Sequence, residues 1–150
     1  MAEITLEYDR LGSRLVKIGE LELAYDRLGS RVCRLGAEEL DYDRLGSRLA
    51  RIGARELAYD RLGSRAIRIG EWELAYDWLG SRLSQLGPYA VTYDHLGSRP
   101  RTIGELQLDY DRLGSRPRHL VAPGDQLSTD DVVALFFVLL LEEEQAESSS

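Results

Sequence analysis

The chain alternates hydrophobic and polar positions in a pattern that returns every 17 residues. In the second copy, residues 20–36, the apolar Leu21, Leu23 and Tyr25 alternate with charged or small residues. An alternation with a period of two is typical of a β-strand with one buried face. A turn-forming Asp-Arg-Leu-Gly segment follows, and a second apolar segment ends at Gly36. Each copy therefore predicts two short strands that pair as a β-hairpin.

The motif Tyr-Asp-X-Leu-Gly-Ser-Arg marks each copy, and the copies together cover residues 1–121. Its tyrosines follow one another at intervals of 17 residues without a gap, at Tyr8, Tyr25, Tyr42, Tyr59, Tyr76, Tyr93 and Tyr110. An unbroken period of this kind indicates one structural unit copied along the chain. We predict an all-β repeat protein in which seven 17-residue β-hairpins form a 14-strand antiparallel meander.

Two kinds of turn are expected to join these strands. Within a hairpin, Asp-Arg-Leu-Gly suits a three-residue loop made of a type I turn and a left-handed glycine. That loop sets Leu23 opposite Cys33. It also sets Glu22 opposite Arg34, and such an oppositely charged pair stabilises a sheet by roughly 0.2–1 kcal/mol. Between hairpins, a pair of residues led by glycine suits a type II′ turn, which sets Arg34 opposite Glu39.

The two faces of the predicted sheet differ in polarity. One face carries glutamates, lysine and arginines, and water can cover it. The other carries Leu23, Tyr25, Arg31, Cys33, Leu35 and their copies, and needs a cover. An open sheet of this many strands would expose a large apolar surface. We therefore expect the sheet to roll up or close, with its first strand paired to its last.

A β-solenoid, with one coil per repeat and a capping helix, is the alternative fold. In a solenoid each motif Asp would stack on the next at about 4.8 Å, and like charges at that distance destabilise a ladder. In the meander, equivalent residues are about 9–10 Å apart, with opposite charges between them. The charge pattern favours the meander.

The sequence after the repeats predicts one buried helix. Residues 122–128 read as a loop, residues 129–145 as an apolar helix and residues 146–150 as a disordered tail. Ser128 is a natural N-cap with Asp131 three residues later. The stretch 132–141 is apolar on every side, so the helix should be buried on every side. We expect the sheet to close around it, and the alternative is a helix that joins two copies of the chain.

The motif arginines are predicted to gather beside the tyrosines at one end of the sheet. They are Arg14, Arg31, Arg48, Arg65, Arg82, Arg99 and Arg116. A helix that re-enters the rolled sheet would bring its negative end to them, together with Glu142, Glu143 and Glu144. Our hypothesis is that these glutamates neutralise the arginine ring and hold the helix, while each Arg stacks on a Tyr.

Composition and charge narrow the classes of function. Acidic residues outnumber basic ones 26 to 19, and the net charge of -7 argues against nucleic acid or an anionic membrane as partner. Cys33 is the only cysteine, so we expect neither a disulfide framework nor a thiol metal cluster. The first residues lack the pattern of a signal peptide, and the longest apolar run is too short for a transmembrane segment. We expect a soluble cytoplasmic protein.

No pattern predicts catalysis, a cofactor or a metal. The motif serines lack a histidine in each repeat that would act as their base. One aspartate per repeat lacks the dense oxygen ligation that calcium requires. The two histidines, His95 and His119, stand where other repeats have Arg or Lys and read as surface substitutions. We predict that the protein is not an enzyme.

Aromatic residues interrupt the repeat in its fifth and sixth copies. Trp72 and Tyr89 share one repeat position, and Trp78 and His95 share another. These four residues are the candidate binding patch for a protein partner or a sugar, and local packing is the alternative explanation.

The motif resembles the YD repeat of Rhs and teneurin proteins, whose core is Tyr-Asp, two residues and then Gly-Arg. That resemblance implies β-hairpins like those that build the cargo-enclosing shell of this family. The present motif differs by a Ser between Gly and Arg and by a shorter period. A sheet rolled around an apolar helix is also similar to the tubby-like architecture, by shape alone.

Two function classes follow. The first is a non-enzymatic structural, assembly or protein-binding scaffold, which associates with itself or with a partner. The alternative is a carrier of a small apolar, lipid-like ligand in the interior of the rolled sheet.

Overall fold

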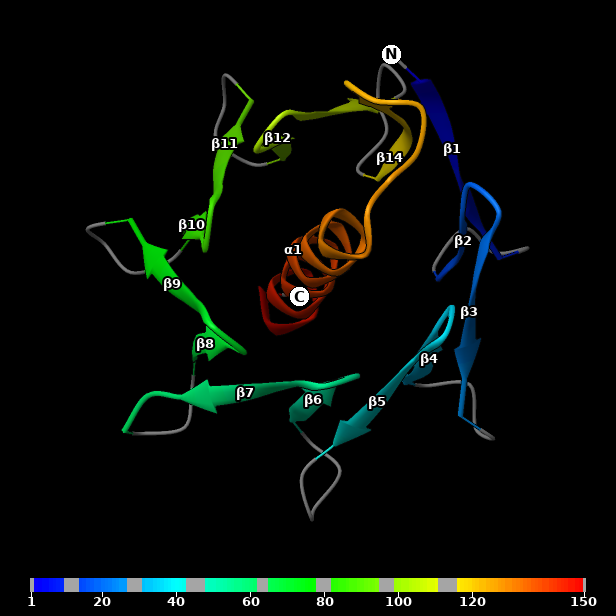
Figure 1. Cartoon of the computed structure of the whole chain (residues 1–150). Coiled ribbons are helices and arrows are strands. Elements are labelled where there is room, and N and C mark those ends of the chain that lie inside the picture. The colour runs from blue at the N-terminus through cyan, green and yellow to red at the C-terminus, as the bar shows by residue number, and fades with distance from the viewer. Residues whose placement is uncertain are drawn as a thin grey trace. The chain divides into compact units, whose positions relative to one another are not determined.

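The predicted antiparallel meander is confirmed by the computed structural model. It describes residues 2–9, 14–26, 31–42, 48–61, 65–77, 82–94, 99–110 and 116–149, with side chains up to residue 139. Fourteen strands follow one another in chain order, and one helix ends the chain (Figure 1). Each strand is hydrogen-bonded to the next, and the order closes on itself with β1 beside β14, as in a closed barrel. Antiparallel neighbours in this order exclude the solenoid.

The strands are of two alternating kinds. The first kind ends at a motif tyrosine: β1 (Ala2–Tyr8), β3 (Leu21–Tyr25), β5 (Glu38–Tyr42), β7 (Arg55–Tyr59), β9 (Trp72–Tyr76), β11 (Tyr89–Tyr93) and β13 (Leu106–Tyr110). The second kind follows a motif arginine: β2 (Leu15–Ile18), β4 (Val32–Leu35), β6 (Leu49–Ile52), β8 (Ala66–Ile69), β10 (Leu83–Leu86), β12 (Pro100–Ile103) and β14 (Pro117–Ala122).

The chain divides into two compact units, an N-terminal unit of residues 4–75 and a C-terminal unit of residues 1–3 and 76–150. In the N-terminal unit the buried side chains come mainly from the two ends of each short strand and the middle of the longer ones. They include Leu6, Leu15, Ile18, Leu23, Val32, Leu35, Leu40, Leu49, Ile52 and Ile69. No polar or charged side chain is buried anywhere in the described part of the chain.

The register across the motif loop differs from the prediction. Leu23 pairs with Leu35 rather than with Cys33, and a β-bulge separates this pairing from the one between Tyr25 and Val32. Arg34 consequently lies opposite Ala24, not Glu22. Cys33 is exposed, although the alternation placed it on the covered face.

The reason for this register is the contact between the motif aspartate and arginine. The amide of Asp26 donates a hydrogen bond to the carbonyl of Arg31 at 2.8 Å, so these two residues face each other and the loop between them consists of residues 27–30. The predicted three-residue loop, with Asp26 opposite Ser30, is therefore wrong by one position. The type of turn within residues 27–30 lies outside the described residues. Cys33 is an extra residue in the following strand and forms a bulge, which adds a second position to the shift, so that Leu23 pairs with Leu35.

The turn between hairpins is the predicted one. Arg34 pairs with Glu39, and Leu35 with Glu38, across the pair of residues that Gly36 leads. Gly36 has φ +62, and no residue other than glycine has a positive φ among those that the structure describes. A positive φ at the first turn residue alone is the requirement of a type II′ turn.

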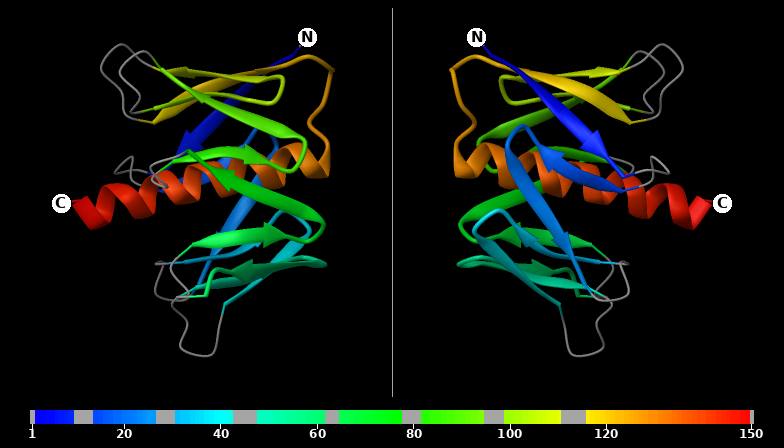
Figure 2. Two further views of the ribbon diagram at one scale, coloured as in Figure 1. Left: turned by 90° about the vertical axis from the view of Figure 1, so that its left-hand side faces the viewer. Right: turned by 90° about the vertical axis from the view of Figure 1, so that its right-hand side faces the viewer.

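The C-terminal unit contains β10 to β14 and the helix α1 (Thr129–Ser149), which packs against β12. Figure 2 shows that α1 runs back in the direction opposite to β14. The predicted N-cap is present, because the amide of Asp131 donates to Oγ of Ser128 at 3.0 Å and the amide of Ser128 donates to Asp131 at 3.2 Å. Every side chain from Val132 to Val138 is at most 6% exposed, so this part of the helix is buried on all sides, as its composition predicts.

The turn glycine provides a test of this fold. A Cβ on Gly36 would lie 2.7 Å from Cδ1 of Leu21, at a positive φ. We expect Gly36→Ala to lower the free energy of unfolding by at least about 1–2 kcal/mol, because the left-handed conformation costs an alanine that much. Gly124→Ala is the matched control, since its Cβ would meet only Gln126 at 3.9 Å. Urea unfolding measures both, and equal midpoints for the two variants would contradict the turn assignment.

Candidate functional site

A recurring contact in the described part of the chain joins a motif arginine to the tyrosine of the following repeat. The guanidinium carbon of Arg31 lies 4.7 Å from the ring centroid of Tyr42, and its Nε donates to Asp26 of its own repeat at 3.2 Å. The same stacking joins Arg14 to Tyr25, Arg48 to Tyr59, Arg82 to Tyr93 and Arg99 to Tyr110. A guanidinium over an aromatic face is an attractive electrostatic contact.

The tyrosine hydroxyl makes the second connection between neighbouring hairpins. Tyr42 donates to the carbonyl of Val32 at 2.8 Å, across the type II′ turn. The same bond joins Tyr25 to Leu15, Tyr59 to Leu49, Tyr93 to Leu83 and Tyr110 to Pro100. The accepting residue is the first of its strand, next to the bulge. Each of these tyrosines therefore links two strands at a place where the bulge interrupts the regular hydrogen bonding of the sheet.

These contacts show what most of the motif does. Its tyrosine and arginine join hairpins to one another, and its aspartate bonds to the arginine of the same repeat. The distances from arginine Nε to the carboxylate range from 2.8 Å in Arg14–Asp9 to 3.9 Å in Arg65–Asp60. The side chains of Glu142, Glu143 and Glu144 lie outside the described ones, so their role in neutralising the arginines stays a prediction.

Tyr89, a member of the predicted aromatic patch, connects the sheet to the helix. Its hydroxyl donates to Oδ1 of Asp131 at 2.7 Å, which joins β11 to the first turn of α1. Burial raises the pKa of the Tyr89 hydroxyl above its ordinary value, and the hydrogen bond to Asp131 raises it further. The hydroxyl therefore stays neutral and remains a donor.

The other members of that patch have different surroundings. The guanidinium carbon of Arg55 lies over the Trp72 ring, 5.4 Å from the ring centroid. Trp78 and His95 lie outside the described residues. Trp72 belongs to the N-terminal unit and Tyr89 to the C-terminal unit. Both described aromatic side chains thus have contacts within the chain, which fits local packing as the reason for their presence.

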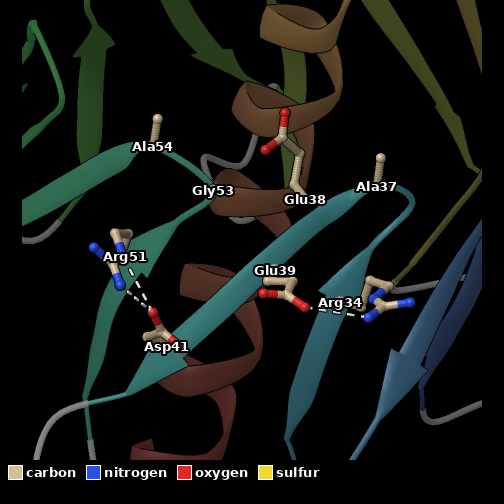
Figure 3. A pocket seen from close by; sticks show the side chains of 8 residues that line it. All are labelled: Arg34, Ala37, Glu38, Glu39, Asp41, Arg51, Gly53 and Ala54. Carbon is tan, nitrogen blue, oxygen red and sulfur yellow. Dashed lines mark hydrogen bonds and ion pairs between the residues drawn. The ribbon is translucent and has the colours of Figure 1, made fainter.

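The outer face of the N-terminal unit carries a ladder of ion pairs. Arg34 bonds to Glu39 at 3.3 Å, and Arg51 bonds to Asp41 at 2.7 Å (Figure 3). The hydrogen bonds that the Arg51 guanidinium donates to the Asp41 carboxylate raise the pKa of Arg51. These pairs are well exposed, so each contributes at most about 1 kcal/mol.

A shallow depression of ≈ 530 Å³ crosses this ladder. Its lining residues are Arg34, Ala37, Glu38, Glu39, Asp41, Arg51, Gly53 and Ala54 (Figure 3). The lining contains no serine, threonine, cysteine or histidine, so no nucleophile lies next to a base in it. Across the residues that the structure describes, no group of His, Cys, Asp and Glu side chains could hold a metal ion. The depression is a polar surface feature without catalytic groups.

Sequence reasoning missed a row of outward-facing side chains that the bulges create. The second residue of a short strand lies in the bulge and leaves the buried face. The row contains Val16, Cys33, Ala50, Ile67, Arg101 and Arg118. Ile67, which is 44% exposed, is the one exposed large hydrophobic residue in the described part of the chain. One indication of this row was present in the sequence, because two of its members, Arg101 and Arg118, end the segment Arg-Pro-Arg, which occurs at residues 99–101 and again at 116–118.

No protein-family model, curated protein or solved structure matches the chain. The resemblances to the YD repeat and to the tubby-like architecture therefore stay expectations. Within the described residues, no helix has both the length and the apolar character that crossing a membrane requires.

The contact between Tyr89 and Asp131 can be tested by removing one hydroxyl. We expect Tyr89→Phe to lower stability by about 1 kcal/mol. Hydrogen exchange should also quicken at the amide of Val132, which bonds to the carbonyl of Ser128 in the first turn of α1. Tyr25→Phe removes a hydroxyl bonded to a strand carbonyl and should leave that amide protected. Unchanged exchange at Val132 in Tyr89→Phe would show that the hydrogen bond does not hold the helix start.

Proposed function

We propose that the protein is a non-enzymatic, cytoplasmic scaffold that binds a protein partner. The observation that carries the proposal is that the recurring residues and the variable residues of each repeat have different roles. The recurring tyrosine and arginine are used in contacts between neighbouring hairpins, and the recurring aspartate bonds to the arginine within one hairpin. The outward-facing positions, by contrast, differ from repeat to repeat, from Ile67 to Arg101 in the bulge row. In repeat proteins, neighbouring units stack to build a common framework whose exposed positions are available for recognition.

The chemistry of the surface supports binding rather than catalysis. The described charged side chains on the outer face are exposed, several are paired with each other, and none lies in an enclosed site. A catalytic site needs groups held in a sheltered place with shifted acidity. Exposed charges and one exposed isoleucine among the described residues resemble the polar rim and apolar core of a modest protein interface.

Native mass spectrometry of the protein, isolated gently from its source cell, tests the proposal. We expect a ligand-free complex in which one chain, or several copies of it, carries a second protein at fixed stoichiometry. Raising the ionic strength should weaken this complex, because exposed charges are screened by salt.

Two outcomes would contradict the scaffold function. A single chain that retains a lipid would establish the carrier alternative. A bare monomer, recovered even after mild crosslinking in the cell, would leave the protein without a partner. Heat-denatured protein added back to an extract is the control for association through exposed apolar surface.

A further inference from the structure

The outer face of the N-terminal unit carries a row of charged side chains whose sign changes from each strand to the next. The register pairs a basic residue on a short strand with a glutamate on the following strand, across each turn between hairpins. Because these residues recur at the same repeat positions, the row crosses every strand from β2 to β9. In chain order, this alternating row consists of Lys17, Glu22, Arg34, Glu39, Arg51, Glu56, Arg68 and Glu73.

The alternating row faces solvent. The side chains of Arg34 and Glu39 are 56% and 73% exposed, and those of Arg68 and Glu73 are 56% and 82% exposed. Arg34, Glu39 and Arg51 belong to neighbouring strands (Figure 3). Strands in a sheet are about 4.8 Å apart, so members of the same sign recur at about 9–10 Å. The row is therefore a regular and accessible pattern of charge.

The strand pairing of this fold does not depend on that pattern. At the same repeat positions, the C-terminal unit has Gln85, Ala90, Thr102, Gln107 and His119. Gln85 still lies opposite Ala90, and Thr102 opposite Gln107. Exposed ion pairs contribute little to stability. The alternating row is thus particular to the N-terminal unit, and the need to pair strands does not explain it.

A row that alternates in sign and has an even number of members is complementary to its own reverse. A twofold axis that lies in an interface, and crosses the row at right angles between β5 and β6, reverses the row. It sets Arg34 opposite Glu56 of a second copy, and Glu39 opposite Arg51 of that copy. Dimers with twofold symmetry bring the same surface of both copies together in this way.

We propose that two copies of the chain associate through the alternating row, in reversed order. This inference goes beyond the proposed function, because it requires no second protein. A partner segment with charges of one sign fits the row poorly, since every second member repels it. A second copy supplies both signs at the required spacing.

The apolar residues beside the row are compatible with this arrangement. Ile67 on β8 is the one exposed large hydrophobic residue that the structure describes, and it lies next to the row. Reversal of the row brings β8 of one copy over β3 of the other. The outward-facing residue of β3 on the same side of the row is Ala24, which is exposed and small. Such a strip is smaller than a standard interface, so we expect a weak and reversible dimer.

Sedimentation velocity of the full-length protein measures this association. A reductant is present, so that the exposed Cys33 forms no disulfide between copies. We expect a monomer–dimer equilibrium in which the dimer fraction rises with protein concentration.

A charge exchange between two variants tests the reversed order. The acidic variant carries Arg34→Glu and Arg51→Glu, and the basic variant carries Glu39→Lys and Glu56→Lys. Each variant alone should stay monomeric, because reversal then opposes like charges. An equimolar mixture should form a heterodimer, because the four central positions are again opposite in sign. The basic variant also reduces the net negative charge of the chain, so its failure to dimerise separates the row from the overall charge.

Two single variants provide the matched control. Arg34→Glu should weaken dimerisation roughly two- to thirtyfold, the effect of losing two exposed ion pairs related by symmetry. Arg101→Glu makes the same change of charge at an exposed arginine of the C-terminal unit and should leave dimerisation unchanged. Circular dichroism and thermal melting verify that each variant is folded, and the single variants suffice if a double variant is not.

A parent that stays monomeric at every concentration would overturn the proposal. Two other results would do the same: folded acidic and basic variants that form no heterodimer, or equal weakening by Arg34→Glu and Arg101→Glu. None of these results concerns the partner protein, so the scaffold function is judged separately by its native complex.

Discussion

The contact that the rest of the structure depends on joins one hairpin to the next through a tyrosine. In the described part of the chain, Arg31 stacks on the ring of Tyr42, and the hydroxyl of Tyr42 bonds to the carbonyl of Val32. A stack at a partly exposed position contributes about 0.5–1 kcal/mol, and a hydrogen bond contributes about 0.5–1.5 kcal/mol. Each contact is small, but the structure shows it again at four further junctions. Each repeat therefore provides both a hairpin and the contact that joins it to the next hairpin.

This junction also determines which side chains face outward. Asp26 and Arg31 face each other across the motif loop, and the extra residue becomes a bulge in β4. Val32 and Leu35 are buried while the two residues between them point outward, which is a spacing of three rather than two. The bulge residue has no part in the core or in the junction, so it is free to differ between repeats. Structural constraint and sequence variation are separated within a single short strand.

The same bulge explains what could and could not be predicted from the sequence. The hairpins, the type II′ turn at Gly36 and the helix cap at Ser128 follow from local patterns, and the closing of the strand order follows from the apolar face that an open sheet would expose. The predicted register across the motif loop is wrong. Alternation and charge pairing favour Glu22 opposite Arg34, and neither pattern reveals the bond between Asp26 and Arg31. Cys33 was placed on the wrong face for this reason. Tyr89 was recognised as an unusual residue, but its partner Asp131 is distant in sequence, and only the tertiary structure brings them together.

A double-mutant cycle on Arg31 and Tyr42 tests the central claim most directly. The free energies of unfolding of the parent, Arg31→Ala, Tyr42→Leu and the double variant would be measured in urea. We predict a coupling energy of about 0.5–1 kcal/mol between these residues, because the guanidinium lies 4.7 Å from the ring. Arg31 and Tyr93 belong to junctions far apart in the chain, and a cycle on that pair should show additivity within about 0.3–0.5 kcal/mol. A coupling between Arg31 and Tyr42 no larger than that of the control pair would contradict the account.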